Sequence, residues 1–350
     1  MMDAIKEIMT MPLKRNNNNN DAPREKTERT LLSYTPELRV LDCTLRDGGL
    51  TNDFKFTDEF ARELYQANIR AGVDYMEFGY RASKEMFDVN KFGKWKFATD
   101  DDIREIIQAD KSPDTMDISI MADVGRCEYQ TDIADREHSP VDLVRVATYI
   151  NTIPAAVAMV EDAHAKGYET SCNIMAVSKS SKEDVCAALE QIARSSVDII
   201  YVVDSYGSLY PEQAQALCSM YVEIADAYGK TVGIHTHNNQ QLAFANTIEG
   251  IRAGVCYLDA TVSSLGRGAG NCPSELLVGF LKNPKYRIDP ILRFIEKQII
   301  PLRESGVKWG YDVPYILTGM LNQHPRAAIE CMENGRTDYS QIYIELSENI

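Results

Sequence analysis

Apolar and polar positions follow two alternating patterns from about residue 38 onward. Short apolar runs of the kind found in buried strands are separated by longer segments in which apolar residues recur at helical spacing. We predict eight strands, at 38–44, 73–80, 116–124, 143–150, 168–177, 197–207, 231–238 and 255–263. We predict seven helices between and after them, at 57–71, 100–110, 154–166, 181–194, 211–228, 241–253 and 274–282. The connection 125–141 has the weakest pattern and is predicted to be mostly loop.

Several of the predicted helices begin with residues suited to a helix N-terminus. Ser181 is followed by Glu183 and Asp184, whose carboxylates favour the positive end of a helix dipole. Pro154 and Pro211 lie near the starts of two other helices, where a missing N–H group leaves no hydrogen bond unmade. These signals support the helix boundaries.

Eight strand-then-helix units predict an α/β protein with a (β/α)8 TIM barrel over residues 38–283. The rival is an open doubly wound sheet, but the GxGxxG motif that usually follows its first strand is missing. Residues 1–37, with a run of five asparagines, are predicted to be a flexible leader. Residues 284–350 are predicted to be a short helical and aromatic extension, either a cap over the barrel mouth or an oligomer contact.

Composition narrows the function classes. The formal net charge of −15 argues against binding nucleic acid or an anionic membrane, because both need clustered Lys and Arg. The chain lacks a signal-peptide pattern and an apolar stretch of about 18 residues, so we predict a cytoplasmic protein. Eight cysteines without a CxxC spacing indicate buried free thiols in a reducing compartment.

Candidate metal ligands follow three of the predicted strands. Active sites of TIM barrels lie at the carboxyl ends of the strands. Arg46 and Asp47 follow the first strand, His235 and His237 lie two apart at the end of the seventh, and Asn271 follows the eighth. Taken separately, these are equally consistent with a surface ion pair, two core histidines and a flexible loop. In a closed barrel the eighth strand lies between the seventh and the first, so the groups can converge on one ion.

Three sequence motifs, "DCTLRDGG", "GIHTHNN" and "LGRGAGNCPSE", resemble signature motifs of the DRE-TIM metallolyase superfamily, the HMG-CoA lyase-like enzymes. The resemblance covers roughly residues 38–282. The stretch from "VRVATYIN" to "VDIIYVVDSYGSLYP" is most similar to the 4-hydroxy-2-oxoacid (oxovalerate) aldolases. The superfamily also includes the isopropylmalate and homocitrate synthases.

The resemblance implies a role for each matching residue. Asp47, His235, His237 and Asn271 match the metal ligands, and Arg46 matches the arginine that binds the enolate oxygen. This donor set suits Mn²⁺ or Mg²⁺, with Co²⁺ or Zn²⁺ as alternatives. The glycines of "RDGG" are expected to let the backbone approach a ligand closely.

Five further residues are candidates for substrate binding. The resemblance implies that Glu77 lies near the metal's waters. Tyr80 and Arg81 follow at the end of the second strand, Arg145 lies on the fourth, and Tyr311 lies in the aromatic extension. Their alternative roles are ordinary ones, surface charge for the arginines and packing for Tyr311.

The proton-transfer group stays open. In the bacterial oxovalerate aldolases a histidine follows the "RDG" motif, whereas this chain has Gly49 and Leu50. The candidates are a metal-bound water and four residues of the extension, Tyr311, Asp312, Tyr315 and His324, with packing or loop structure as the competing interpretation of these residues. Cys272 is not expected to be a nucleophile, because nothing near it in sequence would lower its pKa.

Three functions are consistent with these residues. The first is a metal-dependent aldolase (lyase) that acts on a 4-hydroxy-2-oxo acid through a metal-bound, pyruvate-type enolate, with a 2-oxo acid and an aldehyde as its small-molecule partners. The second is a Claisen-type acyltransferase of the isopropylmalate synthase kind, which usually has a longer C-terminal extension. The third is a non-catalytic metal-binding barrel. The superfamily's barrels are usually dimers or larger, which implies a homo-oligomer.

Overall fold

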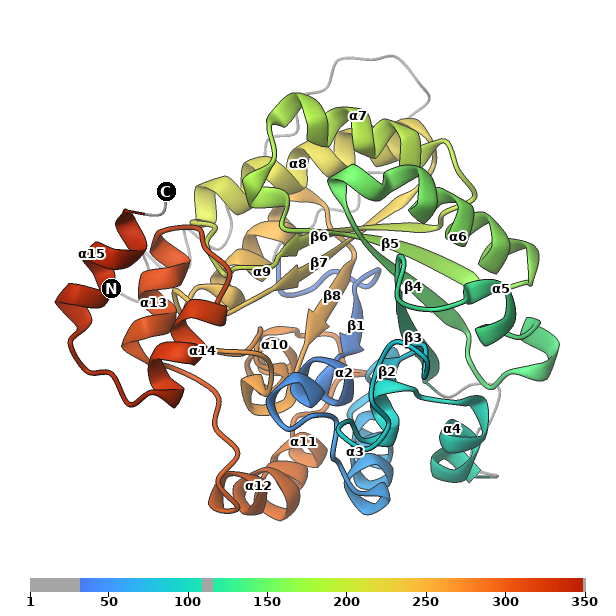
Figure 1. Cartoon of the computed structure of the whole chain (residues 1–350). Helices are drawn as coiled ribbons and strands as arrows, with labels where there is room; N and C mark the ends of the chain where they lie inside the picture. Colours follow the sequence, from blue (N-terminus) through green and yellow to red (C-terminus); the bar gives the residue numbers. More distant parts are fainter. Residues whose placement is uncertain (1–31, 109–115, 349–350) are drawn as a thin grey trace, which may run out of the picture.

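The computed structural model describes residues 32–108 and 116–348, so residues 1–31 of the predicted leader lie outside the described residues. Eight parallel strands close into a barrel in chain order, with β8 paired to both β7 and β1 (Figure 1). The TIM barrel predicted from the sequence is confirmed. The strands are β1 (Arg39–Asp42), β2 (Tyr75–Tyr80), β3 (Asp117–Asp123), β4 (Leu143–Tyr149), β5 (Glu169–Met175), β6 (Ile199–Asp204), β7 (Thr231–Thr236) and β8 (Tyr257–Ala260).

Helices follow the strands around the outside of the barrel. The longer ones are α3 (Asp58–Ala71), α4 (Asp100–Ile107), α6 (Ile153–Ala165), α7 (Lys182–Ala193), α8 (Pro211–Ala227), α9 (Ala243–Ala253) and α10 (Ser274–Phe280). Ser181 caps α7 by accepting a hydrogen bond from the Asp184 N–H, as its position in the sequence predicts. The connection 125–141 holds only α5 (Tyr129–Asp132) and the 3-10 turn η4 (Arg136–His138), which confirms that it is mostly loop.

The remaining short elements lie in loops or in the C-terminal extension. The loops contain α2 (Thr44–Gly48), η1 (Gly49–Thr51), η2 (Lys94–Lys96), η5 (Ile150–Thr152), η6 (Val177–Lys179) and η7 (Val262–Ser264). The extension contains α11 (Asp289–Phe294), the π-helical η8 (Ile295–Ile299), α12 (Ile300–Glu304), α13 (Val313–Met320), α14 (Arg326–Glu333) and α15 (Tyr339–Ser347). No helix of the described ranges is both long enough and apolar enough to cross a membrane.

The barrel interior has an apolar layer and a charged layer. Side chains two apart on a strand face the same side, so each inward position is followed by another further along the strand. The apolar layer is formed by the buried residues Leu41, Cys43, Tyr75, Leu143, Ile199, Tyr201 and Val203. Two residues beyond Tyr75 and Leu143 come Glu77 and Arg145, which are both fully buried. The charged layer therefore lies nearer the carboxyl ends of the strands.

The extension is hydrogen-bonded to loops at the carboxyl ends of the strands. Figure 1 shows α13, α14 and α15, in red, gathered on one side of the barrel. Asn322 accepts hydrogen bonds from the Ser178 and Ser208 hydroxyls at 2.7 and 2.9 Å, in the loops after β5 and β6. Trp309 donates from Nε1 to the Ser263 carbonyl at 3.0 Å, after β8. Three loops of the barrel mouth thus hold the extension.

Candidate functional site

Arg46 and Asp47 lie on α2, a buried five-residue helix that begins two residues after β1 ends. The predicted first strand ran to residue 44, so the chain turns into a helix earlier than its apolar pattern indicates. Gly48 and Gly49 both have helical backbone angles, not the left-handed conformation. A Cβ at Gly48 would lie 2.8 Å from Leu265 Cγ, and one at Gly49 only 2.1 Å from the Phe54 ring. The glycines therefore allow tight packing of α2, which replaces the expected role of bringing backbone close to a ligand.

Asp47, His235 and His237 come together at this end of the barrel. One potential ligand atom from each lies within 4.8 Å of the others, and all three residues are buried. His235 Nε2 lies 3.4 Å from Asp47 Oδ2, and the two imidazole rings have centroids 5.0 Å apart. His237 also forms an isolated β-bridge with Asn271, which brings the fourth predicted ligand alongside.

The immediate surroundings of these groups fit a metal ion. The side-chain oxygen and nitrogen of Asn271 are buried and have no hydrogen-bond partner within the described part of the chain. At Gly266 an added Cβ would lie 2.7 Å from Asn271 Nδ2 and 2.9 Å from Asp47 Oδ1. An orphaned amide oxygen, a carboxylate and two imidazoles are suitable ligands for a divalent cation.

Arg46 is held between two carboxylates. It donates from Nε to Glu77 Oε2 at 2.7 Å and from Nη1 to Asp47 Oδ2 at 2.5 Å. Arg145, fully buried, donates to the same Glu77 oxygen at 3.0 Å and stacks over the Tyr201 ring at 4.4 Å. Glu77 thus joins the two arginines and fixes the direction of the Arg46 guanidinium group.

Asp259, on β8, completes this network. It accepts a hydrogen bond from Arg145 Nη2 at 2.6 Å and lies 2.9 Å from His235 Nδ1. A proton on Nδ1 leaves the Nε2 lone pair facing Asp47. The network contains three carboxylates and two guanidinium groups, so one negative charge remains when His235 is neutral. That excess favours a bound cation.

The protonation states of the group follow from burial and from these neighbours. Burial alone would raise the pKa of Asp47, but the adjacent Arg46 guanidinium group holds it well below its usual value, so Asp47 is ionised. Burial, together with the nearby Arg267, lowers the pKa of His237 well below its ordinary value. The imidazole of His237 is therefore neutral, the form that can bind a metal.

A family model described as HMGL-like matches residues 37–296, most of the chain. The chain belongs to the HMGL-like family. It is 33% identical over 245 residues to oxaloacetate decarboxylase of Mycobacterium tuberculosis, covering 69% of each chain. It is 29% identical over 255 residues to 4-hydroxy-2-oxovalerate aldolase of Pelotomaculum thermopropionicum, covering 72% of each.

Solved structures agree with this assignment of the HMGL-like fold. The N-terminal domain of a candidate aldolase from Bacteroides vulgatus matches with a TM-score of 0.70 and 26% identity, over 84% of this chain and 96% of that one. The carboxyl transferase domain of Rhizobium etli pyruvate carboxylase matches with a TM-score of 0.63, over 87% of this chain and 55% of that one. Its identity of 17% supports the fold alone.

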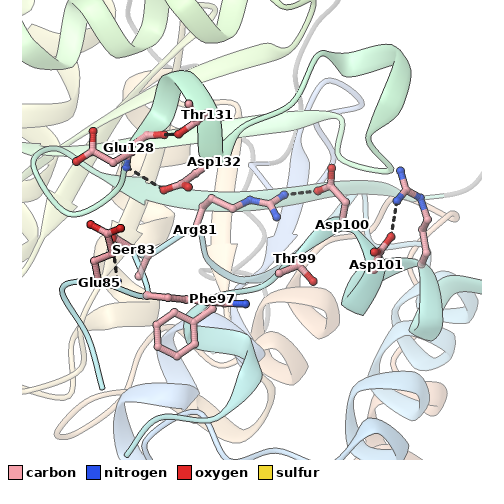
Figure 2. Close-up of a pocket in the computed structure, with 13 residues that line it drawn as sticks. Arg81, Ser83, Glu85, Phe97, Thr99, Asp100, Asp101, Glu128, Thr131 and Asp132 are labelled. Carbon is pink, nitrogen blue, oxygen red and sulfur yellow. Dashed lines mark hydrogen bonds and ion pairs between the residues drawn. The ribbon is translucent and has the colours of Figure 1, made fainter. Parts of the chain in front are cut away.

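The other predicted substrate-binding residues are distributed differently. Tyr80 is buried beside Arg46, with its ring centroid 5.9 Å from the guanidinium carbon. Arg81 forms an ion pair with Asp100 in the wall of a side pocket of about 600 Å³, which Figure 2 shows. None of the proposed metal ligands lines that pocket. Tyr311 is 65% exposed, and Arg145 lies inside the barrel rather than at its mouth.

Two further residues contact the proposed metal ligands, and the sequence did not indicate a role for them. Asp259 is a lone acid in the apolar run "VCYLDATVS", and that isolation is the signal that could have revealed it. Arg267 donates its backbone N–H to Asp47 Oδ1 at 3.0 Å, and its guanidinium group reaches His324 of the extension. Among the other extension candidates, Tyr315 packs with Ala269 and Ala328. Burial raises the pKa of Cys272 to about 12, in keeping with its expected inertness.

Proposed function

We propose that this protein is a divalent-metal-dependent carbon–carbon lyase that acts on a 4-hydroxy-2-oxo acid through a pyruvate-type enolate. The observation that carries the proposal is the convergence of Asp47, His235 and His237 beside the fixed guanidinium group of Arg46. Membership of the HMGL-like family and the resemblance to oxovalerate aldolases support the same reaction class.

Asp47, His235, His237 and Asn271 would hold the metal. The mixture of one carboxylate, one amide oxygen and two imidazoles favours a six-coordinate ion such as Mn²⁺ or Mg²⁺. When bound, the ion would supply Lewis acidity to the carboxylate and keto oxygens of a 2-oxo acid. Asp259 supports this role by keeping His235 Nε2 directed at Asp47.

Arg46 would stabilise the negative charge that develops on the substrate oxygen. Its Nε and Nη1 groups are occupied by Glu77 and Asp47, whereas no residue of the described ranges accepts a hydrogen bond from Nη2. A donor fixed in this way needs no reorganisation when charge appears, and loss of such a donor typically lowers a rate by about 10²–10³. Burial of the whole group strengthens the interaction because the surroundings are of low polarity.

Two related reactions would share this enolate. Retro-aldol cleavage of a 4-hydroxy-2-oxo acid and decarboxylation of a 3-carboxy-2-oxo acid both leave the electron pair of the broken bond on the carbon next to the keto group. The 33% identity to an oxaloacetate decarboxylase makes decarboxylation the second candidate. A Claisen-type acyltransferase would add a requirement for an acyl-CoA, and a non-catalytic barrel would form no enolate.

Deuterium exchange tests the enolate directly. The purified protein is incubated with Mn²⁺ and pyruvate in D₂O, and loss of the methyl proton signal is followed by NMR. We expect metal-dependent exchange in the wild type and none in Asp47→Ala or His235→Ala. Absence of exchange in wild-type protein that binds Mn²⁺ would contradict the proposal. Product analysis with a 4-hydroxy-2-oxo acid, with oxaloacetate and with an acyl-CoA then separates the reactions.

A further inference from the structure

Arg267 links the proposed metal ligands to the mouth of the barrel. Its backbone N–H binds Asp47, while its side chain extends toward the C-terminal extension. Nη2 donates to the Ser205 carbonyl at 2.8 Å, and Nη1 lies 3.3 Å from His324 Nε2. Nε is buried and has no hydrogen-bond partner among residues 32–108 and 116–348. The guanidinium group is thus only partly satisfied.

The hydrogen bond at the other side of the His324 ring determines where its proton lies. The backbone N–H of Arg326 donates to His324 Nδ1 at 3.0 Å, which uses the Nδ1 lone pair. A neutral imidazole carries one proton, so that proton is on Nε2. A guanidinium group cannot accept a hydrogen bond. Nε2–H and the Nη1 group of Arg267 are therefore two donors that face each other without an acceptor between them.

The local charge keeps this arrangement in place. Burial and the nearby charges of Arg267 and Arg326 lower the pKa of His324 to about 4, so the ring is neutral near pH 7. The Tyr206 ring packs edge-on against His324, with centroids 5.7 Å apart. In a chain of net charge −15, two arginines and an imidazole N–H at the mouth make a site of locally positive potential.

The same hydrogen bond argues against His324 as the missing proton-transfer base. A base needs a free lone pair, and the Nδ1 lone pair is already engaged by the Arg326 N–H. Nε2 is a donor in the neutral ring. Its chemistry is therefore that of a group that binds an oxyanion.

We infer that Arg267 and His324 together bind a carboxylate at the far end of the substrate, which makes the substrate class the 2-oxo dicarboxylic acids. The inference rests on the proposed function, in which the 2-oxo acid end lies at Asp47 and Arg46. A carboxylate oxygen lying beside both groups could accept from Arg267 Nη1 and from His324 Nε2, which are 3.3 Å apart, and so supply the acceptor that both donors lack and pair with a fixed positive charge.

The C-terminal extension would then take part in choosing the substrate. His324 lies in the connection between α13 and α14, two residues after Asn322, whose side chain is hydrogen-bonded to the loops after β5 and β6. This contact fixes His324 opposite Arg267. Three barrel loops and the extension would therefore enclose the far end of the substrate.

Two ligands of equal length test the inference. 2-Oxoglutarate and 2-oxopentanoate share a five-carbon 2-oxo acid chain, and only the first carries a carboxylate at the far end. Isothermal titration calorimetry in the presence of Mn²⁺ gives both dissociation constants. We expect the full-length protein to bind 2-oxoglutarate about tenfold or more tightly, the effect of a charge-assisted hydrogen-bonded pair.

Variants assign that preference to the two residues. Arg267→Met retains the backbone N–H to Asp47, and His324→Phe retains the ring beside Tyr206. The quantity compared is the ratio of the two dissociation constants in each variant. Each substitution should reduce the preference for 2-oxoglutarate to threefold or less, because about threefold is half of the tenfold factor on a logarithmic scale. His324→Gln, which restores an N–H donor, should recover part of it. Arg252→Met removes an arginine that is paired with Glu249 on α9 and should keep the wild-type ratio.

The outcomes separate this inference from the proposed function. Equal affinity of the wild type for both ligands would overturn the inference and leave the 2-oxo acid site intact. A preference that survives both Arg267→Met and His324→Phe would also overturn it. Failure of both ligands to bind protein that holds Mn²⁺ would overturn the proposed function and the inference with it.

Discussion

On the side nearest the histidines, the buried charge network depends on Asp259. It is the acceptor for both Arg145 and His235, so one carboxylate satisfies a buried cation and also orients a proposed metal ligand. Arg145 has Glu77 as its other carboxylate partner. Removing Asp259 would leave one guanidinium nitrogen and the His235 Nδ1–H group without their acceptor, in a region from which water is excluded.

We therefore predict separate effects of two substitutions at Asp259. Asp259→Asn keeps an oxygen for His235 but loses the charge, and should weaken Mn²⁺ binding about 10–100-fold, as is typical for residues that orient a metal ligand. Asp259→Ala should also lower the free energy of unfolding by about 3–5 kcal/mol, because a buried ion pair loses one partner. Mn²⁺ titration followed by EPR and urea unfolding measure the two effects.

A carboxylate at the other end of the barrel is the matched control. Asp198 accepts hydrogen bonds from the backbone N–H and the hydroxyl of Thr170. Asp198→Asn should change stability without changing Mn²⁺ affinity. Unchanged Mn²⁺ affinity in Asp259→Asn would show that His235 does not depend on Asp259 for its orientation.

At the scale of elements, α2 owes its position to packing rather than to its own sequence. A five-residue helix with two glycines at and after its end has little intrinsic stability, because nucleation is costly and glycine is a poor helix former. Phe54 and Leu265 hold it by direct contact with the glycine backbone. The position of Arg46 and Asp47 thus depends on how closely Gly49 approaches Phe54.

Gly49→Ala should accordingly displace α2. Its Cβ would lie 2.1 Å from the Phe54 ring, so we expect a loss of about 1–3 kcal/mol in the free energy of unfolding and weaker Mn²⁺ binding. The double variant Gly49→Ala/Phe54→Leu, with a smaller side chain opposite, should recover part of both losses. Thermal unfolding and Mn²⁺ titration provide the measurements. Equal behaviour of the single and double variants would rule out this contact as the cause.

The elements also differ in how far the sequence predicts them. The eight strands were predictable because buried parallel strands are continuous apolar runs, and their order placed the ends of β7, β8 and β1 together. The helix α2 was not predictable, because a five-residue segment is too short to show helical periodicity. The Arg145–Asp259 pair joins residues 114 apart, and spacing along the chain contains no information on such a contact. The donor pair of Arg267 and His324 forms only where the extension packs on the barrel, so it too could not be predicted from spacing along the chain.

At the scale of the whole molecule, the C-terminal extension forms part of the barrel mouth only while its contacts with the barrel loops are in place. The extension meets the mouth through the apolar packing of Tyr315 against Ala269 and through polar contacts, of which those of Asn322 are the most concentrated. Its side chain accepts from the Ser178 and Ser208 hydroxyls and donates to the Ser178 carbonyl at 2.9 Å. Contacts of this kind can open locally without unfolding the barrel.

Asn322→Gly should loosen the extension and leave the barrel intact. Asn322 has a positive φ of 49°, a conformation that glycine tolerates, so this substitution removes the side-chain hydrogen bonds without backbone strain. Loss of these bonds should lower the free energy of local opening by about 1–3 kcal/mol, which makes amide exchange in α13 roughly fivefold faster or more. Hydrogen–deuterium exchange with mass spectrometry measures this, and α8 in the barrel wall should exchange at the wild-type rate as the internal control. Unchanged exchange in α13 would mean that other contacts hold the extension, whereas faster exchange in both helices would mean that extension and barrel open as one unit.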